Sequence, residues 1–161
     1  MSFLAPPPGE EGLELAGLLV MPARLIYMRS MVRRSVVLVA DRSRLAANLF
    51  RLLISPMGAA LIARRSLRDA IAGLRRGMRV DLMIVSTNSM GPRPEESLPA
   101  LGLEAAARVR KIFLCTDSRS DRALAKSLGE LQNSRIMSRP FEPAKLAGVI
   151  QGVIGGAGSD A

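Results

Sequence analysis

Residues 36–41 read Val-Val-Leu-Val-Ala-Asp, an apolar run that ends on one carboxylate. A strand with one solvated face alternates apolar and polar residues, whereas a strand that is buried on both faces is apolar throughout. The run therefore predicts a buried strand of a parallel sheet. Asp41 marks the point where the chain leaves that strand.

Apolar runs of this kind recur, and segments with helical spacing separate them. Four further short runs predict strands at 60–63, 82–85, 112–115 and 135–138. Regular alternation of strand and helix is typical of a parallel sheet with helices on both faces, joined by right-handed crossovers. The sequence therefore predicts a flavodoxin-like α/β fold, with a doubly wound sheet of five parallel strands.

The helices between these strands are predicted from apolar spacing and from capping residues. Ser66 is expected to cap the second helix and Gly77 to end it. Residues 88–99 contain three prolines and a glycine, so they predict a loop, which a helix over 104–109 follows. The buried face of the first helix is predicted to consist of Leu45, Leu49, Leu52 and Leu53.

The alternation fills residues 35–155, which are predicted to form one domain. Residues 1–34 are predicted to be an N-terminal extension, partly disordered or with a short helix, and residues 156–161 a flexible tail. An alternative is that translation starts at Met28 or Met31. The extension does not resemble a signal peptide, because its acidic residues precede its apolar part. No apolar stretch reaches the ~18 residues of a membrane span, so no membrane association is expected.

The chain is basic, with a net charge of +9 from 23 Lys and Arg against 14 Asp and Glu. This excess indicates either an anionic partner or a genomic preference for arginine codons. The second explanation is favoured, because the arginines are spread along the chain and aromatic residues do not alternate with them. The composition therefore weighs against a nucleic acid as the partner.

The content of cysteine and histidine limits the reactions that the chain could catalyse. Cys115 is the one cysteine and lies in an apolar run, so a buried thiol and a reducing cytoplasm are expected. The chain contains no histidine. Histidine-based acid–base catalysis, histidine metal ligation and a phosphohistidine relay are therefore excluded.

In doubly wound sheets, ligands bind at the carboxyl ends of the strands. The segments 37–43, 81–86, 113–117 and 138–143 surround these ends. Their order and spacing resemble the receiver domain of bacterial response regulators over about residues 35–155. The resemblance implies a strand order of 2-1-3-4-5.

The resemblance also assigns a role to each strand end. In the family, two acids after the first strand help to hold Mg²⁺, an Asp after the third accepts the phosphoryl group, and a hydroxyl and a Lys contact the phosphate. Asp41 matches the first acid and Thr116 the hydroxyl. Arg42 takes the place of the second acid, Ser86 that of the acceptor, and Arg139 that of the lysine.

These replacements predict a site without phosphorylation chemistry. The acceptor must be a nucleophilic carboxylate, and Ser86 has no activating base that the sequence reveals. Asp41, Arg42 and Arg139 give a net charge of +1 if all three point inward, which would repel Mg²⁺. An ion pair between Asp41 and Arg139 is expected instead. Asp81 and Asp117 are poor substitute acceptors, because Asp81 begins its strand and Asp117 lies in the loop after the neighbouring strand. We expect no catalytic residue, no metal, no cofactor and no enzyme activity.

The sequence therefore predicts a degenerate, non-phosphorylatable receiver that acts as a protein-interaction and regulatory module in bacterial signal transduction. Its partner is expected to be a signalling protein or a second copy of the chain. An alternative is an arginine-based sensor of a phosphate-bearing ligand such as a cyclic dinucleotide. A working phospho-receiver with displaced acids is the least supported. The resemblance places the interaction face at Arg119, Arg122, Lys126 and Arg135.

Overall fold

The computed structural model describes residues 33–116, 124, 127, 131 and 133–156. The chain divides into two units, Met1–Arg33 and Arg34–Ala161. The helices and strands described below all belong to the second unit. The extension predicted for residues 1–34 and the tail predicted for 156–161 lie almost wholly outside the described residues.

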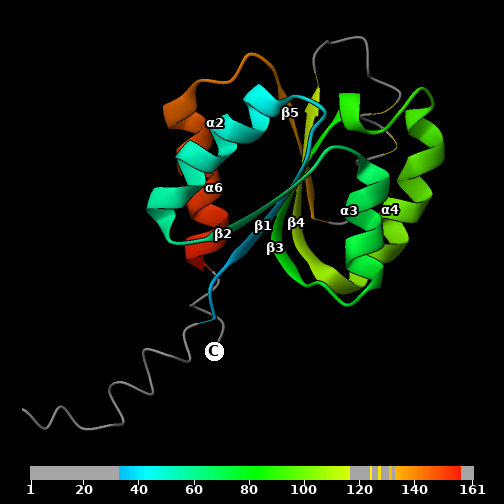
Figure 1. Cartoon of the computed structure of the whole chain (residues 1–161), viewed down its shortest axis with the longest axis horizontal. Coiled ribbons are helices and arrows are strands. Elements are labelled where there is room, and N and C mark those ends of the chain that lie inside the picture. Colours follow the sequence, from blue (N-terminus) through cyan, green and yellow to red (C-terminus); the bar gives the residue numbers. More distant parts are fainter. Residues whose placement is uncertain (1–32, 117–123, 125–126, 128–130, 132, 157–161) are drawn as a thin grey trace, which may run out of the picture. The chain divides into compact units, whose positions relative to one another are not determined.

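A parallel sheet forms the centre of the second unit (Figure 1). Within the described residues it has five strands in the order β2-β1-β3-β4-β5, which confirms the predicted fold class. The strands are β1 (Val36–Ala40), β2 (Ala60–Arg64), β3 (Val80–Ser86), β4 (Val109–Thr116) and β5 (Ser134–Ser138).

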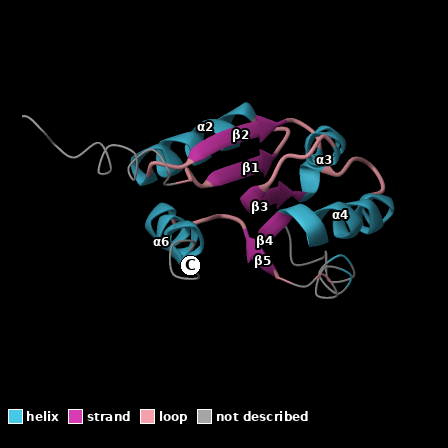
Figure 2. Cartoon of the chain, turned by 90° about the horizontal axis from the view of Figure 1, so that it is seen from below, coloured by secondary structure: helices cyan, strands magenta, loops and turns pink. Residues whose placement is uncertain are grey.

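Helices cover both faces of this sheet (Figure 2). Helices α2 (Arg44–Ile54) and α6 (Pro143–Gly155) pack on one face, around Phe50, Phe113 and Ile150. Helices α3 (Leu67–Arg75) and α4 (Pro94–Arg108) pack on the other. The 3-10 turns η1 (Ser55–Met57) and η2 (Thr87–Ser89) follow α2 and β3. The central strands are thus buried on both sides, as their continuous apolar runs predict.

The caps of α3 agree with the sequence. The Ser66 hydroxyl accepts a hydrogen bond from the Asp69 amide at 3.1 Å, and Gly77 follows the helix with φ of +94°. A residue with a Cβ atom is strained at such an angle, so glycine ends the helix at little cost.

The predicted face of α2 is wrong in part. Leu45 and Leu52 are 80% and 74% exposed, while Phe50 and Ile54 are fully buried. The buried stripe follows the spacing 46, 50, 53, 57, with Ala46, Leu53 and Met57 packed on the core. A second apolar stripe on the same helix therefore points to solvent. Spacing alone did not reveal which of the two stripes the sheet covers.

The loop predicted for 88–99 is also wrong beyond residue 93. Helix α4 begins at Pro94, where the missing amide proton is not needed, and it contains Pro99. Pro99 is exposed, and its ring removes one hydrogen bond of the helix. Leu98 and Leu101 are buried against the sheet, and this packing outweighs the cost of the proline. Val109, predicted as helical, is the first residue of β4.

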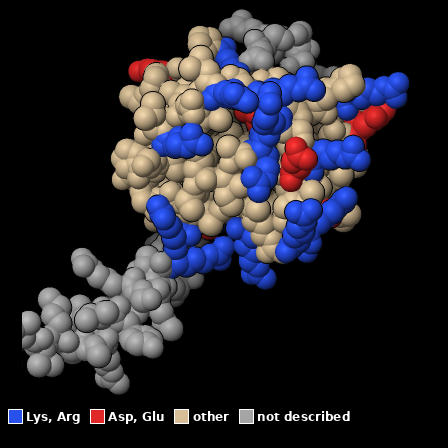
Figure 3. Space-filling view, viewed as in Figure 1, with Lys and Arg blue, Asp and Glu red and all other residues tan. Residues whose placement is uncertain are grey.

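Lys and Arg side chains are spread over the face shown in Figure 3. None of the helices among the described residues combines the length and the apolar character that a bilayer crossing needs.

Candidate functional site

The carboxyl end of the sheet brings three of the predicted side chains together. Asp41 follows β1, Ser86 ends β3 and Arg139 follows β5. Ala40 pairs with Val85 in the parallel register, so the next residues, Asp41 and Ser86, are neighbours across the two strands. Both are buried, with 2% and 1% of their surface exposed.

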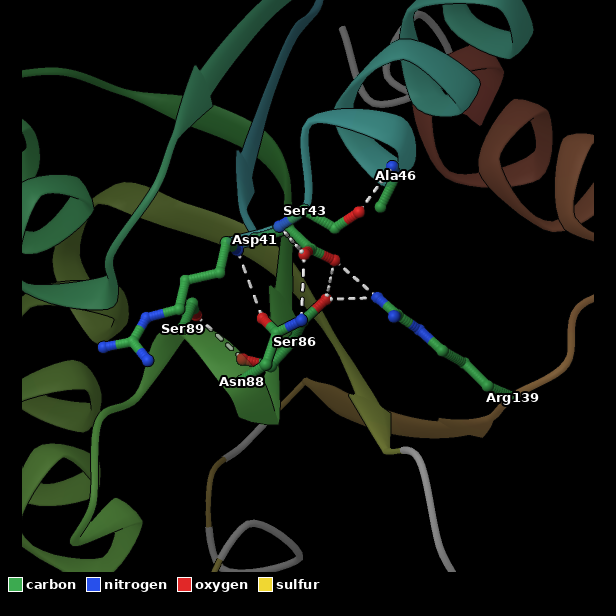
Figure 4. Close-up of polar contacts among 8 residues, drawn as sticks. Asp41, Ser43, Ala46, Ser86, Asn88, Ser89 and Arg139 are labelled. Carbon is green, nitrogen blue, oxygen red and sulfur yellow. Dashed lines mark hydrogen bonds and ion pairs between the residues drawn. The ribbon is translucent and has the colours of Figure 1, made fainter.

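Asp41 accepts hydrogen bonds on both carboxylate oxygens (Figure 4). Oδ1 accepts from the Ser43 amide at 2.7 Å and from Asn88 Nδ2 at 3.0 Å. Oδ2 accepts from the Ser86 hydroxyl and from Arg139 Nη2, the latter at 2.5 Å. A carboxylate offers about four lone-pair sites. The four donors therefore occupy the whole hydrogen-bonding capacity of Asp41.

Arg139 is held from several sides. Its Nη2 also donates to Ser86 Oγ at 2.7 Å, and its backbone amide donates to the Thr116 carbonyl at 2.9 Å. The guanidinium carbon lies 5.6 Å from the centre of the Phe141 ring, which packs at 6.5 Å from the ring of Phe50. Ring and carboxylate together fix the cation in one position. The predicted ion pair with Asp41 is present.

The environment of Asp41 favours its charged form. Burial raises the pKa of this carboxyl group. The hydrogen bonds from Ser86, from the Ser43 amide, from Asn88 and from Arg139 outweigh burial and lower the pKa below its ordinary value of 3.8. Asp41 is therefore ionised at neutral pH.

This lowered pKa predicts how Asp41 contributes to stability. Its stabilising effect is complete above the pKa of an unfolded Asp, about 3.9, and is lost as pH falls through the lower native pKa. In Asp41→Asn, the deficit in unfolding free energy relative to wild type is expected to be constant from about pH 7 to 5 and to shrink below about pH 4. Urea denaturation of both proteins across this range measures it. A deficit that grows on acidification would contradict the assignment.

Arg42 does not join the cluster. Its side chain is exposed, and its backbone amide donates to Asn88 Oδ1 at 3.2 Å. The condition for a net charge of +1, that all three side chains point inward, is therefore not met, and Asp41 and Arg139 form a neutral pair. Thr116 is buried at the end of β4, and its described link to the cluster is the carbonyl that accepts from the Arg139 amide.

The predicted interaction face is described at one position. Arg119, Arg122 and Lys126 lie outside the described residues. Arg135 is exposed on β5 and lines a cavity of about 240 Å³ between β5 and α6, together with Ile136 and other side chains. Ile136 is 39% exposed.

Sequence reasoning assigned no role to two members of the cluster, Ser43 and Asn88, although both lie at the strand ends it singled out. Ser43 could have been found, because an Asp side chain often accepts from the amide two residues later. The Ser43 hydroxyl also caps α2 by accepting from the Ala46 amide at 3.2 Å. Asn88 depends on the turn η2, which carries its amide group to Asp41, and no local pattern predicts that turn.

The structure also corrects the expectation that Ser86 has no base nearby. Its hydroxyl donates directly to Asp41 Oδ2. A carboxylate with a lowered pKa is a weak base, and this one is already paired with Arg139. Ser86 is 1% exposed, so a substrate has no direct approach to the hydroxyl. The contact positions Ser86 and does not activate it.

Solved structures with the same fold include receiver domains and response regulators. The signal receiver domain of an HD domain-containing protein from Pseudomonas fluorescens Pf-5 superposes with a TM-score of 0.65 at 20% identity, covering 80% of this chain and 100% of its own. The chain has the receiver-domain fold. A response regulator receiver protein from Pseudomonas putida gives a TM-score of 0.63 at 19% identity, with coverages of 74% and 97%. A response regulator from Thermotoga maritima gives 0.61 at 20% identity, with 76% and 98%.

Sequence comparison adds nothing to this result, since neither models of protein families nor curated protein sequences match the chain. At such low identity the function has to be inferred from the residues of this chain itself.

Asp81, one of the substitute acceptors considered above, accepts a hydrogen bond from the Val36 amide at 2.8 Å. Val36 is the first residue of β1, so Asp81 lies at the amino edge of the sheet, opposite the cluster.

The residues at the carboxyl edge do not fit the Mg²⁺ ion that the receiver fold implies. Among the described side chains, no group of three or more Asp, Glu, His or Cys residues is placed to hold a metal. Both oxygens of Asp41 are engaged by four donors, one of them a guanidinium. A divalent cation would have to displace Arg139 and meet its positive charge.

Proposed function

We propose that the chain is a non-phosphorylatable receiver-like domain that acts as a regulatory module in bacterial signalling, and that it is not an enzyme. One observation carries the proposal: Arg139 Nη2 donates to both Asp41 Oδ2 and Ser86 Oγ. The guanidinium thereby occupies the space that metal and phosphate would need. The nucleophile that an acyl phosphate requires is missing at Ser86.

This arrangement supports a domain held in one state. In a phosphorylation switch, new charge at the acceptor recruits the hydroxyl and the cation that follow β4 and β5. Here the cation is already bound by Asp41 and Ser86, so no unpaired charge remains in the pair to drive such a movement. A module of this kind regulates by binding through its surface. The β5 and α6 region around Arg135 is the surface we propose for a signalling protein or a second copy.

A ligand-sensing role has less support. A phosphate-bearing ligand such as a cyclic dinucleotide would need an arginine that is available at the strand ends. Arg139 would have to give up its bonds to Asp41 and Ser86, and Asp41 would then remain buried without its cation. Arg42 is exposed and projects outside the cluster. The site therefore favours the locked module over the sensor.

The locked state predicts no response to phosphoryl mimics. Beryllofluoride with Mg²⁺ is expected to leave the ¹H–¹⁵N spectrum of the full chain unchanged, because neither a nucleophilic carboxylate nor a metal site is available. A variant with Arg42→Asp, Ser86→Asp and Arg139→Lys rebuilds the acids and the lysine, and serves as the positive control. Saturable shifts in the wild-type protein that Asp117→Asn abolishes would refute the proposal.

A further inference from the structure

The segment from Arg64 to Arg79 contains six arginines and one acidic residue within sixteen positions. All six arginine residues are exposed. We define the α3 arginine strip as these six residues: Arg64, Arg65, Arg68, Arg75, Arg76 and Arg79.

Two members of the strip, Arg68 and Arg75, lie on α3 itself, and the other four flank this helix in the chain. Helix α3 buries four apolar residues against the sheet, so its opposite side faces water. Arg68 and Arg75 are seven residues apart, which places them on the same side about 10 Å apart along the axis. Arg64 and Ile62 are two residues apart on β2, so their side chains point to the same face of the sheet. Ile62 packs on the face that α3 and α4 cover, and Arg64 therefore projects from that face.

Little negative charge compensates this strip. Within the described residues, Arg75 is the strip member with an ion pair, at 2.9 Å from Glu104, and the same Glu104 also binds Arg108. The acid inside the segment, Asp69, accepts from the Ser66 hydroxyl. Lys and Arg side chains accordingly dominate the surface around β2 and α3 (Figure 3).

The surroundings of the strip indicate the kind of partner. Protein interfaces usually centre on exposed apolar or aromatic anchors. Among the described residues, the large exposed apolar side chains lie outside this segment, on α2, α4 and β5: Leu45, Leu52, Leu103 and Ile136. The segment also has no aromatic residue on which a base could stack. Guanidinium groups alone suit phosphate groups in a regular array.

We propose that the α3 arginine strip binds the phosphate backbone of double-stranded nucleic acid without reading its sequence. A duplex carries one negative charge per ~1.7 Å of its axis, so a stretch as long as α3, about 13 Å, presents some eight phosphates. The sequence argued against a nucleic acid because its arginines are spread along the chain. The fold brings six of them onto α3 and the segments that directly flank it, all exposed, and this surface does not depend on the cluster at Asp41.

A salt titration of binding tests this proposal. The full chain is expected to bind a labelled 20-base-pair duplex in 50 mM salt, measured by fluorescence anisotropy. The variant Arg65→Gln, Arg68→Gln, Arg76→Gln leaves the Arg75 ion pair intact and is expected to bind at least about tenfold more weakly. Its log–log salt slope should be smaller by about 3, because each arginine that binds a phosphate contributes about one unit to the slope.

A matched variant distinguishes the effect of the strip from the effect of lowering the net positive charge. Arg44→Gln, Arg51→Gln, Lys145→Gln removes the same charge from α2 and α6, on the other side of the sheet, and is expected to change the affinity by less than about threefold. Equal losses in the two variants would overturn the proposal, as would no binding of the duplex at 50 mM salt. Polyglutamate that competes as well as the duplex would also overturn it and would indicate an acidic protein partner. Circular dichroism of both variants verifies that they are folded.

Discussion

Replacement of Arg139 by methionine is expected to lower the free energy of unfolding by about 3 kcal/mol. The change removes the guanidinium that pairs with Asp41, whose side chain is fully buried. A buried charge left without its counter-ion typically costs about 3–5 kcal/mol. The lower value is expected here, because three neutral donors still bind the carboxylate and 23% of the Arg139 side chain is exposed. Urea denaturation at neutral pH measures the difference.

Two controls make this result specific. Lys145→Met removes an ion pair with Glu142 in which both side chains are mostly exposed, and such pairs contribute about 0–1 kcal/mol. The double variant Asp41→Asn, Arg139→Met removes both charges, so its loss is expected to be smaller than the sum of the two single losses. Strict additivity, or a loss below about 1 kcal/mol in Arg139→Met, would show that Asp41 and Arg139 do not stabilise each other.

The fold could be predicted because each buried strand has its own apolar run, and because strand and helix alternate. The helix faces were harder to predict. Leu45 and Leu52 are as apolar as Leu49 and Leu53, yet the sheet covers the stripe that contains Phe50. The choice between two apolar stripes depends on how the helix packs. That is a tertiary property, which one helix does not specify.

The residues of the site could be predicted, but not the direction of every side chain. Parallel strands end at one edge, so Asp41, Ser86 and Arg139 had to meet if the order was right. The direction of Arg42 was not predictable. Its backbone is held by Asn88, and Asn88 is placed by the turn after β3, 46 residues along the chain. Long-range contacts of this kind decide whether a loop side chain points inward. The hydrogen bond from the Ser86 hydroxyl to Asp41 is another such contact.

Replacement of Ser86 by aspartate is expected to cost about 3 kcal/mol more stability at neutral pH than replacement by asparagine, which has nearly the same shape. Aspartate at this position would place a second carboxylate against Asp41 Oδ2, where the Ser86 hydroxyl now donates. Arg139 would then be shared by two buried acids. Mutual repulsion raises the pKa of one of the pair, and a rise of about two units corresponds to about 2.7 kcal/mol.

The sign of the pH dependence distinguishes this effect from a loss of packing. A carboxyl group with a raised native pKa binds its proton more tightly in the folded state, so stability increases as pH falls through that pKa. The loss of stability in Ser86→Asp is therefore expected to shrink between about pH 7 and 5. At neutral pH, Mg²⁺ is also expected to reduce this loss, since two carboxylates attract the cation. Ser86→Asn has no added charge and should show neither effect. If both variants were equally stable and insensitive to Mg²⁺, the argument that Arg139 neutralises only one acid would fail. Ser86 is neutral, so Arg139 has a single carboxylate to neutralise, that of Asp41. With this pair of residues, Asp41 stays ionised and keeps all of its hydrogen bonds.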